Sequence, residues 1–147
     1  MTGEFDQAAM AELGARLAAQ LRAGDVIGLS GDLGAGKTTL ARAILAALGL
    51  AGEAPSPTFA IVQPYDVPDV RLPVAHVDLY RLDDPDDVRE LGLEDYADGG
   101  ALLIEWPERL PAGTWPELLL LRLEGTGTTR RLTAKVPAAW EGRWPPR

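Results

Sequence analysis

Apolar residues recur every three or four positions in two parts of the chain. This spacing is typical of amphipathic helices and predicts one at residues 6–21, followed by Gly24 and Asp25. The apolar face of this helix consists of Met10, Leu13, Leu17 and Leu21. A second helix is predicted at residues 38–48, with Gly49 after its last turn and an apolar side made by Leu40, Ile44, Leu45 and Leu48.

Short uninterrupted apolar runs predict buried strands at residues 26–30 and 101–105. Further strands are expected at residues 59–65, 72–80, 118–123 and 131–136. A short helix is expected to begin in the acidic run at residues 83–87 and to extend toward Leu91, because acidic residues stabilise the start of a helix. The order of strand, loop and helix followed by several strands predicts an α/β fold with a mixed sheet.

Between the first strand and the second helix lies the pattern G-x-x-x-x-G-K-[ST], which is typical of a phosphate-binding loop. Glycines let the backbone wrap closely around phosphate oxygens, and the N-terminus of the following helix adds a partial positive charge. The lysine provides a charge for the outer phosphates, the next hydroxyl can bind Mg²⁺, and Thr39 can donate to the α-phosphate. The pattern consists of Gly31, Asp32, Leu33, Gly34, Ala35, Gly36, Lys37 and Thr38.

A P-loop needs a carboxylate near its metal, usually at the end of a neighbouring buried strand. Asp78 and Glu105 each stand where an apolar run stops, so both are candidates. Asp78 could hold the Mg²⁺ shell through water or polarise an attacking water, and Glu105 could bind Mg²⁺ directly or act as a base. Trp106 is expected either over this site or in the core.

Two further features could belong to the site. Thr58, in the Ser-Pro-Thr run at residues 56–58, lies where several nucleotide hydrolases carry a threonine that responds to the γ-phosphate. The alternative for this run is a rigid turn without a ligand. His76 is the single histidine, and a lone mid-strand histidine is more often a packing residue than a catalytic one.

Composition narrows the classes of function. The chain has 147 residues, which suits one domain (residues 1–147), and we expect a peripheral tail at residues 139–147. It has no cysteine, which excludes disulfides and thiolate metal sites, and no visible signal peptide, so a cytoplasmic location is expected. Its net charge of −8 opposes tight direct binding to nucleic acid by this chain alone, and no apolar run is long enough to span a membrane.

Four motifs together resemble the TsaE family, the ATPase subunits of the bacterial machinery that makes threonylcarbamoyladenosine in tRNA. They are GDLGAGKTT at residues 31–39, SPTF at 56–59, HVDLYRL at 76–82 and EWPE at 105–108. The resemblance covers about residues 5 to 135. It implies a P-loop NTPase-like three-layer sandwich whose mixed, mainly parallel sheet carries antiparallel additions.

The resemblance also implies slow, Mg²⁺-dependent ATP hydrolysis that is activated in a complex. The expected partners are the tRNA threonylcarbamoyl-transferase subunit and its paralogous partner protein. By position, Lys37 and Thr38 would hold phosphates and metal, and Glu105 would ligate Mg²⁺. Activity would also involve Asp78, Thr58 and Trp106, and Gln7 would contact the nucleotide.

Two other classes of protein share a P-loop. A small-molecule P-loop kinase usually carries a lid with arginines and a substrate pocket, for which this short chain has little room. A non-catalytic nucleotide-sensing module would bind ATP and dock on a partner without releasing phosphate.

Overall fold

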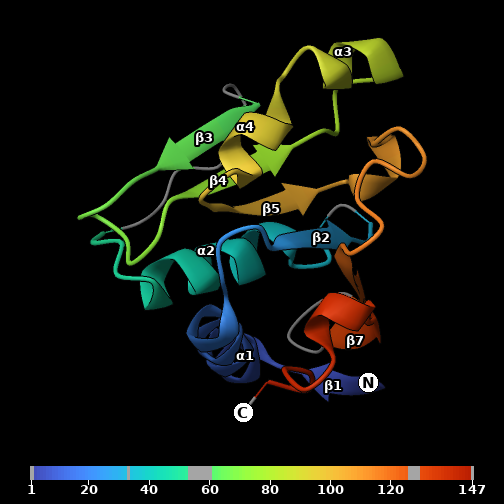
Figure 1. Cartoon of the computed structure of the whole chain (residues 1–147). Coiled ribbons are helices and arrows are strands. Elements are labelled where there is room, and N and C mark those ends of the chain that lie inside the picture. Colours follow the sequence, from blue (N-terminus) through green and yellow to red (C-terminus); the bar gives the residue numbers. More distant parts are fainter. Residues whose placement is uncertain (1, 33, 53–60, 126–129, 147) are drawn as a thin grey trace.

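A seven-stranded mixed sheet forms the centre of the computed structural model, which describes residues 2–32, 34–52, 61–125 and 130–146. The strand order is β1-β7-β6-β2-β5-β4-β3. The four central strands β6, β2, β5 and β4 run parallel, whereas β1, β7 and β3 add antiparallel pairings at the two edges (Figure 1). The predicted α/β fold with antiparallel additions is therefore confirmed.

The strands have the following bounds: β1 Thr2–Phe5, β2 Val26–Ser30, β3 Val62–Tyr65, β4 Val74–Asp78, β5 Ala101–Glu105, β6 Leu119–Glu124 and β7 Arg130–Lys135. The α-helices are α1 Gln7–Gln20, α2 Lys37–Ala47, α3 Pro85–Arg89 and α4 Leu93–Ala97, and the 3-10 helices are η1 Pro107–Arg109 and η2 Ala138–Trp140. Every residue of β2 and of β5 is buried, as expected of strands covered on both faces.

Helices α1 and α2 cover one face of the sheet. The apolar face predicted for α1 is buried with α2 and with inward residues of the central strands, among them Leu29 and Leu103. A Cβ atom on Gly14 would lie 2.5 Å from Cβ of Ala43, so the two helices approach too closely for a larger residue there. This tight packing holds α2 in place, and with it the first turn of α2, which directly follows the glycine-rich loop.

The other face carries a second, smaller core. Val77, Leu102 and Ile104 pack there against residues of α3, α4 and the segment after β5, including Val88 and Leu93. Helices therefore flank the sheet on both sides over β4 and β5. None of the helices in the described part of the chain combines the length and apolar character needed to cross a bilayer.

Within residues 139–146 the C-terminal segment is packed against the core, which corrects the prediction of a peripheral tail for this part of residues 139–147. Trp140 is fully buried in the core that α1 and α2 share, and Arg143 is only 7% exposed. The guanidinium of Arg143 forms a bidentate ion pair with Asp25 at 2.7 and 3.0 Å. The buried ring of Trp140 and the ion pair of Arg143 hold this segment against the core. Neither feature produces the regular spacing of apolar residues from which a helix or strand is predicted.

Candidate nucleotide-binding site

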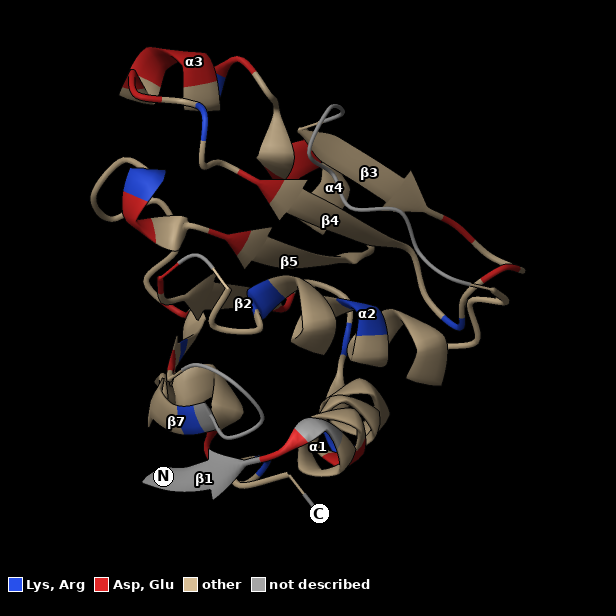
Figure 2. Ribbon diagram, turned by 180° about the vertical axis from the view of Figure 1, so that it is seen from behind, with Lys and Arg blue, Asp and Glu red and all other residues tan. Residues whose placement is uncertain are grey.

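Three chain segments meet at the carboxyl edge of the parallel strands. Because β2, β4 and β5 run in the same direction, the loop after Ser30 and the acids that end β4 and β5 share one edge of the sheet. Asp78 and Glu105 are register partners at this edge. Figure 2 shows acidic residues at the ends of both strands and a basic residue at the start of α2.

The glycine-rich loop joins β2 to α2. Gly31 has φ of 138°, and a Cβ atom there would lie 2.1 Å from the carbonyl oxygen of Leu123 on β6, so only glycine fits. Gly36, the residue before α2, also has a positive φ of 108°. Gly36 is the N-cap residue of α2 and has no side chain that could accept hydrogen bonds from the first-turn N–H groups. This arrangement favours the binding of an anion at the start of the helix.

Lys37 is buried inside this loop. Its Nζ donates to the carbonyl oxygens of Gly31 at 2.6 Å and of Asp32 at 2.7 Å. Burial lowers the pKa of Lys37, and nearby carboxylates, first among them Glu105, oppose that shift. The ammonium group is thus held at the loop by main-chain oxygens and acidic neighbours.

Thr38 and Glu105 form a direct contact between α2 and β5. The hydroxyl of Thr38 donates to Oε1 of Glu105 at 2.8 Å. A hydroxyl and a carboxylate are hard oxygen ligands of the kind that Mg²⁺ uses together with phosphate oxygens and water. The donor set therefore fits a magnesium ion bound with a nucleotide.

Asp78 is half-buried beside this pair, and its Oδ1 accepts the backbone N–H of Tyr80 at 3.0 Å. Burial raises the pKa of the Asp78 carboxyl, and the charge of Glu105 raises it further, although the Tyr80 N–H and the Lys37 ammonium oppose the shift. Asp78 and Glu105 thus have distinct surroundings: Glu105 contacts Thr38, whereas Asp78 caps the turn after β4.

Trp106 lies over the site rather than in the core alone. Its ring centroid is 4.5 Å from Nζ of Lys37 and 4.9 Å from the ring centroid of Tyr80. The backbone of Trp106 has a φ of 62°, in a region that non-glycine residues rarely occupy and that often marks functional positions.

His76 is the site residue whose contact the sequence did not indicate. Its side chain is fully buried, and Nε2 lies 2.6 Å from Oε2 of Glu105. The two-residue offset between His76 and Asp78 was the available signal, because it places both side chains on the same face of β4.

The other predicted residues belong to the glycine-rich loop, to α2, to α1 and to segments outside the described residues. Gly34, Ala35 and Thr39 take their expected places in the loop and the first turn of α2, and Gln7 is the first residue of α1. Leu33 and Thr58 lie outside the described residues, as does the side chain of Gln7.

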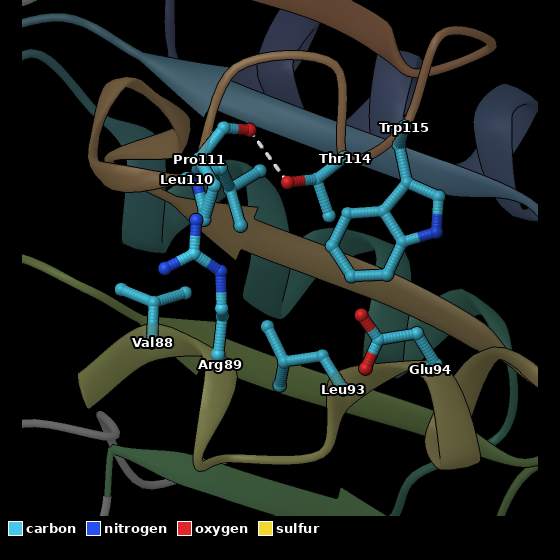
Figure 3. Close-up of a pocket in the computed structure, with 8 residues that line it drawn as sticks. All are labelled: Val88, Arg89, Leu93, Glu94, Leu110, Pro111, Thr114 and Trp115. Carbon is cyan, nitrogen blue, oxygen red and sulfur yellow. Dashed lines mark hydrogen bonds between the residues drawn. The ribbon is translucent and has the colours of Figure 1, made fainter. Parts of the chain in front are cut away.

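Two pockets are lined by residues of the described segments. One, of about 570 Å³, begins at Ser30 and extends past Trp115 to Arg122 and Lys135 on the β6–β7 face. The other, of about 250 Å³, lies between the segments that follow β4 and β5, with the residues drawn in Figure 3: Val88, Arg89, Leu93, Glu94, Leu110, Pro111, Thr114 and Trp115. The larger pocket therefore adjoins the loop directly, through Ser30.

Comparison with known proteins agrees with this geometry. A family model described as "Threonylcarbamoyl adenosine biosynthesis protein TsaE" matches residues 5–133. The chain belongs to the TsaE family. All four TsaE-like motifs lie inside the matched range.

Curated relatives carry the same family name. A protein of Streptomyces coelicolor named "tRNA threonylcarbamoyladenosine biosynthesis protein TsaE" is 41% identical over 116 residues, which cover 78% of each chain. Identically named proteins are 47% identical in Synechocystis, over 67% of this chain and 64% of the relative, and 38% identical in Bacillus subtilis, over 78% and 70%. Among solved structures, Bacillus subtilis YdiB matches with a TM-score of 0.73 and 30% identity, over 97% of this chain and 89% of YdiB.

The TsaE relationship connects the chain with the biosynthesis of threonylcarbamoyladenosine in tRNA and with a nucleotide-binding P-loop fold.

Proposed function

We propose that this protein binds ATP with Mg²⁺ and hydrolyses it as a subunit of the assembly that forms threonylcarbamoyladenosine in tRNA next to the anticodon. The observation that carries the proposal is the 2.8 Å contact between the Thr38 hydroxyl and the Glu105 carboxylate beside a P-loop lysine. Family membership supports the tRNA part of the proposal.

The binding roles divide among three residues. Lys37 would exchange its contacts with the carbonyls of Gly31 and Asp32 for phosphate oxygens, which are stronger acceptors for an ammonium group. Thr38 and Glu105 would hold Mg²⁺, the ion that neutralises charge on the transferred phosphoryl group when bound. The remaining loop residues and Thr39 would supply main-chain and hydroxyl donors to the phosphates.

The geometry favours Glu105 as the metal ligand and Asp78 as the residue that orients the attacking water or accepts its proton. Glu105 contacts the hydroxyl that is expected on the metal, whereas Asp78 contacts a backbone N–H. A raised pKa brings the Asp78 carboxyl nearer to the operating pH, which suits a base. Trp106 would contact the bound nucleotide, and Thr58 would respond to its γ-phosphate.

The expected partners are the threonylcarbamoyl-transferase subunit and its paralogous partner. With a net charge of −8, the protein is poorly suited to hold tRNA itself, so contact with RNA would fall to those subunits. We further propose that residues 1–147 act as one ATPase domain and that the protein works in the cytoplasm, where tRNA is available.

The test is reconstitution. The protein is mixed with the candidate transferase subunit, its paralogue, an activated threonylcarbamoyl donor, ATP, Mg²⁺ and unmodified tRNA, and both phosphate release and the modified nucleoside are measured. We expect both to rise on adding this protein and to stay at background with Lys37→Ala. Binding of Mg-ATP without any phosphate release in the complete mixture would refute the proposed hydrolysis. ATP consumed only when a small metabolite acceptor is supplied, with the phosphoryl group transferred to that acceptor, would indicate a kinase.

A further inference from the structure

His76 is a buried polar side chain between two apolar residues of β4. It stands in the middle of β4, is 0% exposed, and has apolar neighbours on either side in the strand. Burying an imidazole is costly unless it is hydrogen-bonded. Its contact is the carboxylate of Glu105, at 2.6 Å from Nε2 to Oε2.

The direction of this hydrogen bond follows from the state of Glu105. A carboxylate that binds Mg²⁺ is ionised and only accepts hydrogen bonds, so Nε2 of His76 must carry the proton. Within the described residues, Nδ1 of His76 is buried without a hydrogen-bond partner. This observation fits the neutral tautomer with its proton on Nε2, because Nδ1 then has a lone pair and no unpaired N–H group.

The two oxygens of Glu105 therefore have separate partners. His76 holds Oε2 from β4, while Oε1 accepts from the Thr38 hydroxyl on α2. The terminal torsion of a glutamate is broad, so a carboxylate held on one side only can rotate. A donor fixed in a buried strand removes that freedom.

We propose that His76 is a positioning residue for Glu105: its Nε2–H fixes Oε2 in the core, so that Oε1 faces the position where Mg²⁺ and Thr38 meet. The inference rests on the proposed function, because it concerns the metal ligand of the same site. Residues that orient a metal ligand typically contribute 10- to 100-fold to metal affinity.

The experiment measures Mg²⁺ affinity rather than turnover. A fluorescent ADP analogue is titrated with Mg²⁺ in wild type, His76→Leu, His76→Gln and His76→Asn, and its binding without metal is measured in parallel. We expect His76→Leu to weaken Mg²⁺ binding about 10- to 100-fold and to leave metal-free binding unchanged. His76→Gln, whose amide nitrogen reaches about as far as Nε2, should retain most of the Mg²⁺ affinity, and the shorter His76→Asn should not.

Val74→Ala is the matched control for packing. Val74 lies two residues before His76 on the same face of β4, is 3% exposed, and loses only apolar contacts on truncation. We expect Val74→Ala to lower the melting temperature without changing Mg²⁺ affinity.

Four outcomes would overturn the inference. They are equal Mg²⁺ affinity in wild type and folded His76→Leu, equal affinity in His76→Gln and His76→Asn, equal loss in Val74→Ala and His76→Leu, and no Mg²⁺-dependent binding in wild type. The last would also remove the proposed function, whereas the first three would leave it standing. If His76→Leu does not fold, the comparison between His76→Gln and His76→Asn decides.

Discussion

The ammonium group of Lys37 lies 4.5 Å from the ring centroid of Trp106. The ring thus covers a cation that is also hydrogen-bonded to two loop carbonyls. A nucleotide that draws this ammonium toward its phosphates must change the surroundings of the indole ring. The fluorescence of Trp106 should therefore change when a nucleotide binds.

Intrinsic fluorescence should follow nucleotide binding through Trp106. We expect the emission change on adding Mg-ATP to disappear in Trp106→Phe and to persist in Trp115→Phe, because Trp106 is the ring that lies against Lys37 whereas Trp115 lines the two pockets. Trp106→Phe should still bind nucleotide, which calorimetry can check. A full emission change in Trp106→Phe would contradict the placement of this ring at the site.

Removal of the Lys37 ammonium should abolish nucleotide binding and leave the fold intact. Charge-assisted contacts to phosphate are about twice as strong as neutral ones, so calorimetry with Mg-ATP should detect no binding by Lys37→Ala. The variant should melt no lower than wild type, since it no longer buries an ammonium group. Unchanged affinity and turnover would refute the P-loop assignment.

The lowered pKa of Lys37 also predicts how the ligand-free protein responds to pH. Since the folded pKa lies below the ordinary value of 10.5, the unfolded chain binds more protons between these two values. The contribution of Lys37 to the free energy of unfolding should therefore rise as pH increases through that interval. Urea unfolding at a series of pH values approaching 10.5 from below should show that wild type gains free energy of unfolding relative to Lys37→Met. Parallel curves for the two proteins would contradict it.

Glu105→Gln should reduce turnover much more than nucleotide binding. The variant keeps the size of the side chain but replaces an anionic metal ligand with a neutral amide, and metal stabilisation of the transferred phosphoryl group is worth several kcal/mol. With the partners and saturating Mg²⁺ present, we expect turnover to fall by at least about 10-fold.

Glu108→Gln is the control for Glu105→Gln, because Glu108 is an exposed carboxylate that also acts electrostatically on Lys37. It should remain close to wild type. Equal turnover in wild type and Glu105→Gln would argue against a metal role for Glu105.

Much of this site could be predicted from local sequence. The runs at 26–30 and 101–105 form β2 and β5 with the same bounds, because strands buried on both faces need continuous apolar residues. The strand β1 and the short α4 were not predicted, since four or five residues carry too little periodicity. The contact between His76 and Glu105 joins residues 29 positions apart, and its formation depends on how β4 and β5 are aligned.

Asp78→Asn should stabilise the protein while lowering turnover. The carboxyl has a raised pKa, so above that pKa the folded state bears the cost of a partly buried charge. The amide keeps an oxygen for the Tyr80 N–H but cannot take a proton from water. We expect a higher melting temperature than wild type near pH 7, with the difference shrinking as pH falls toward the ordinary value of 3.8.

Asp69→Asn, at an exposed position, serves as the control for this effect and should leave both melting temperature and turnover unchanged. If Asp78→Asn melts at a lower temperature than wild type at every pH, the charge of the Asp78 carboxylate stabilises the folded protein, which contradicts the argument from burial.

The buried pair between Asp25 and Arg143 should hold the C-terminal segment in place. Both side chains are less than one tenth exposed, and the Arg143 guanidinium also stacks 4.1 Å from the ring of Trp140. Arg143→Ala leaves the Asp25 carboxylate buried without its cation, a change that typically costs 3–5 kcal/mol. Chemical denaturation should show a loss of about this size, whereas Arg89→Ala, which breaks an exposed pair with Asp86, should cost about 0–1 kcal/mol. Equal small losses in both variants would mean that residues 138–146 add little to stability despite the burial of Trp140.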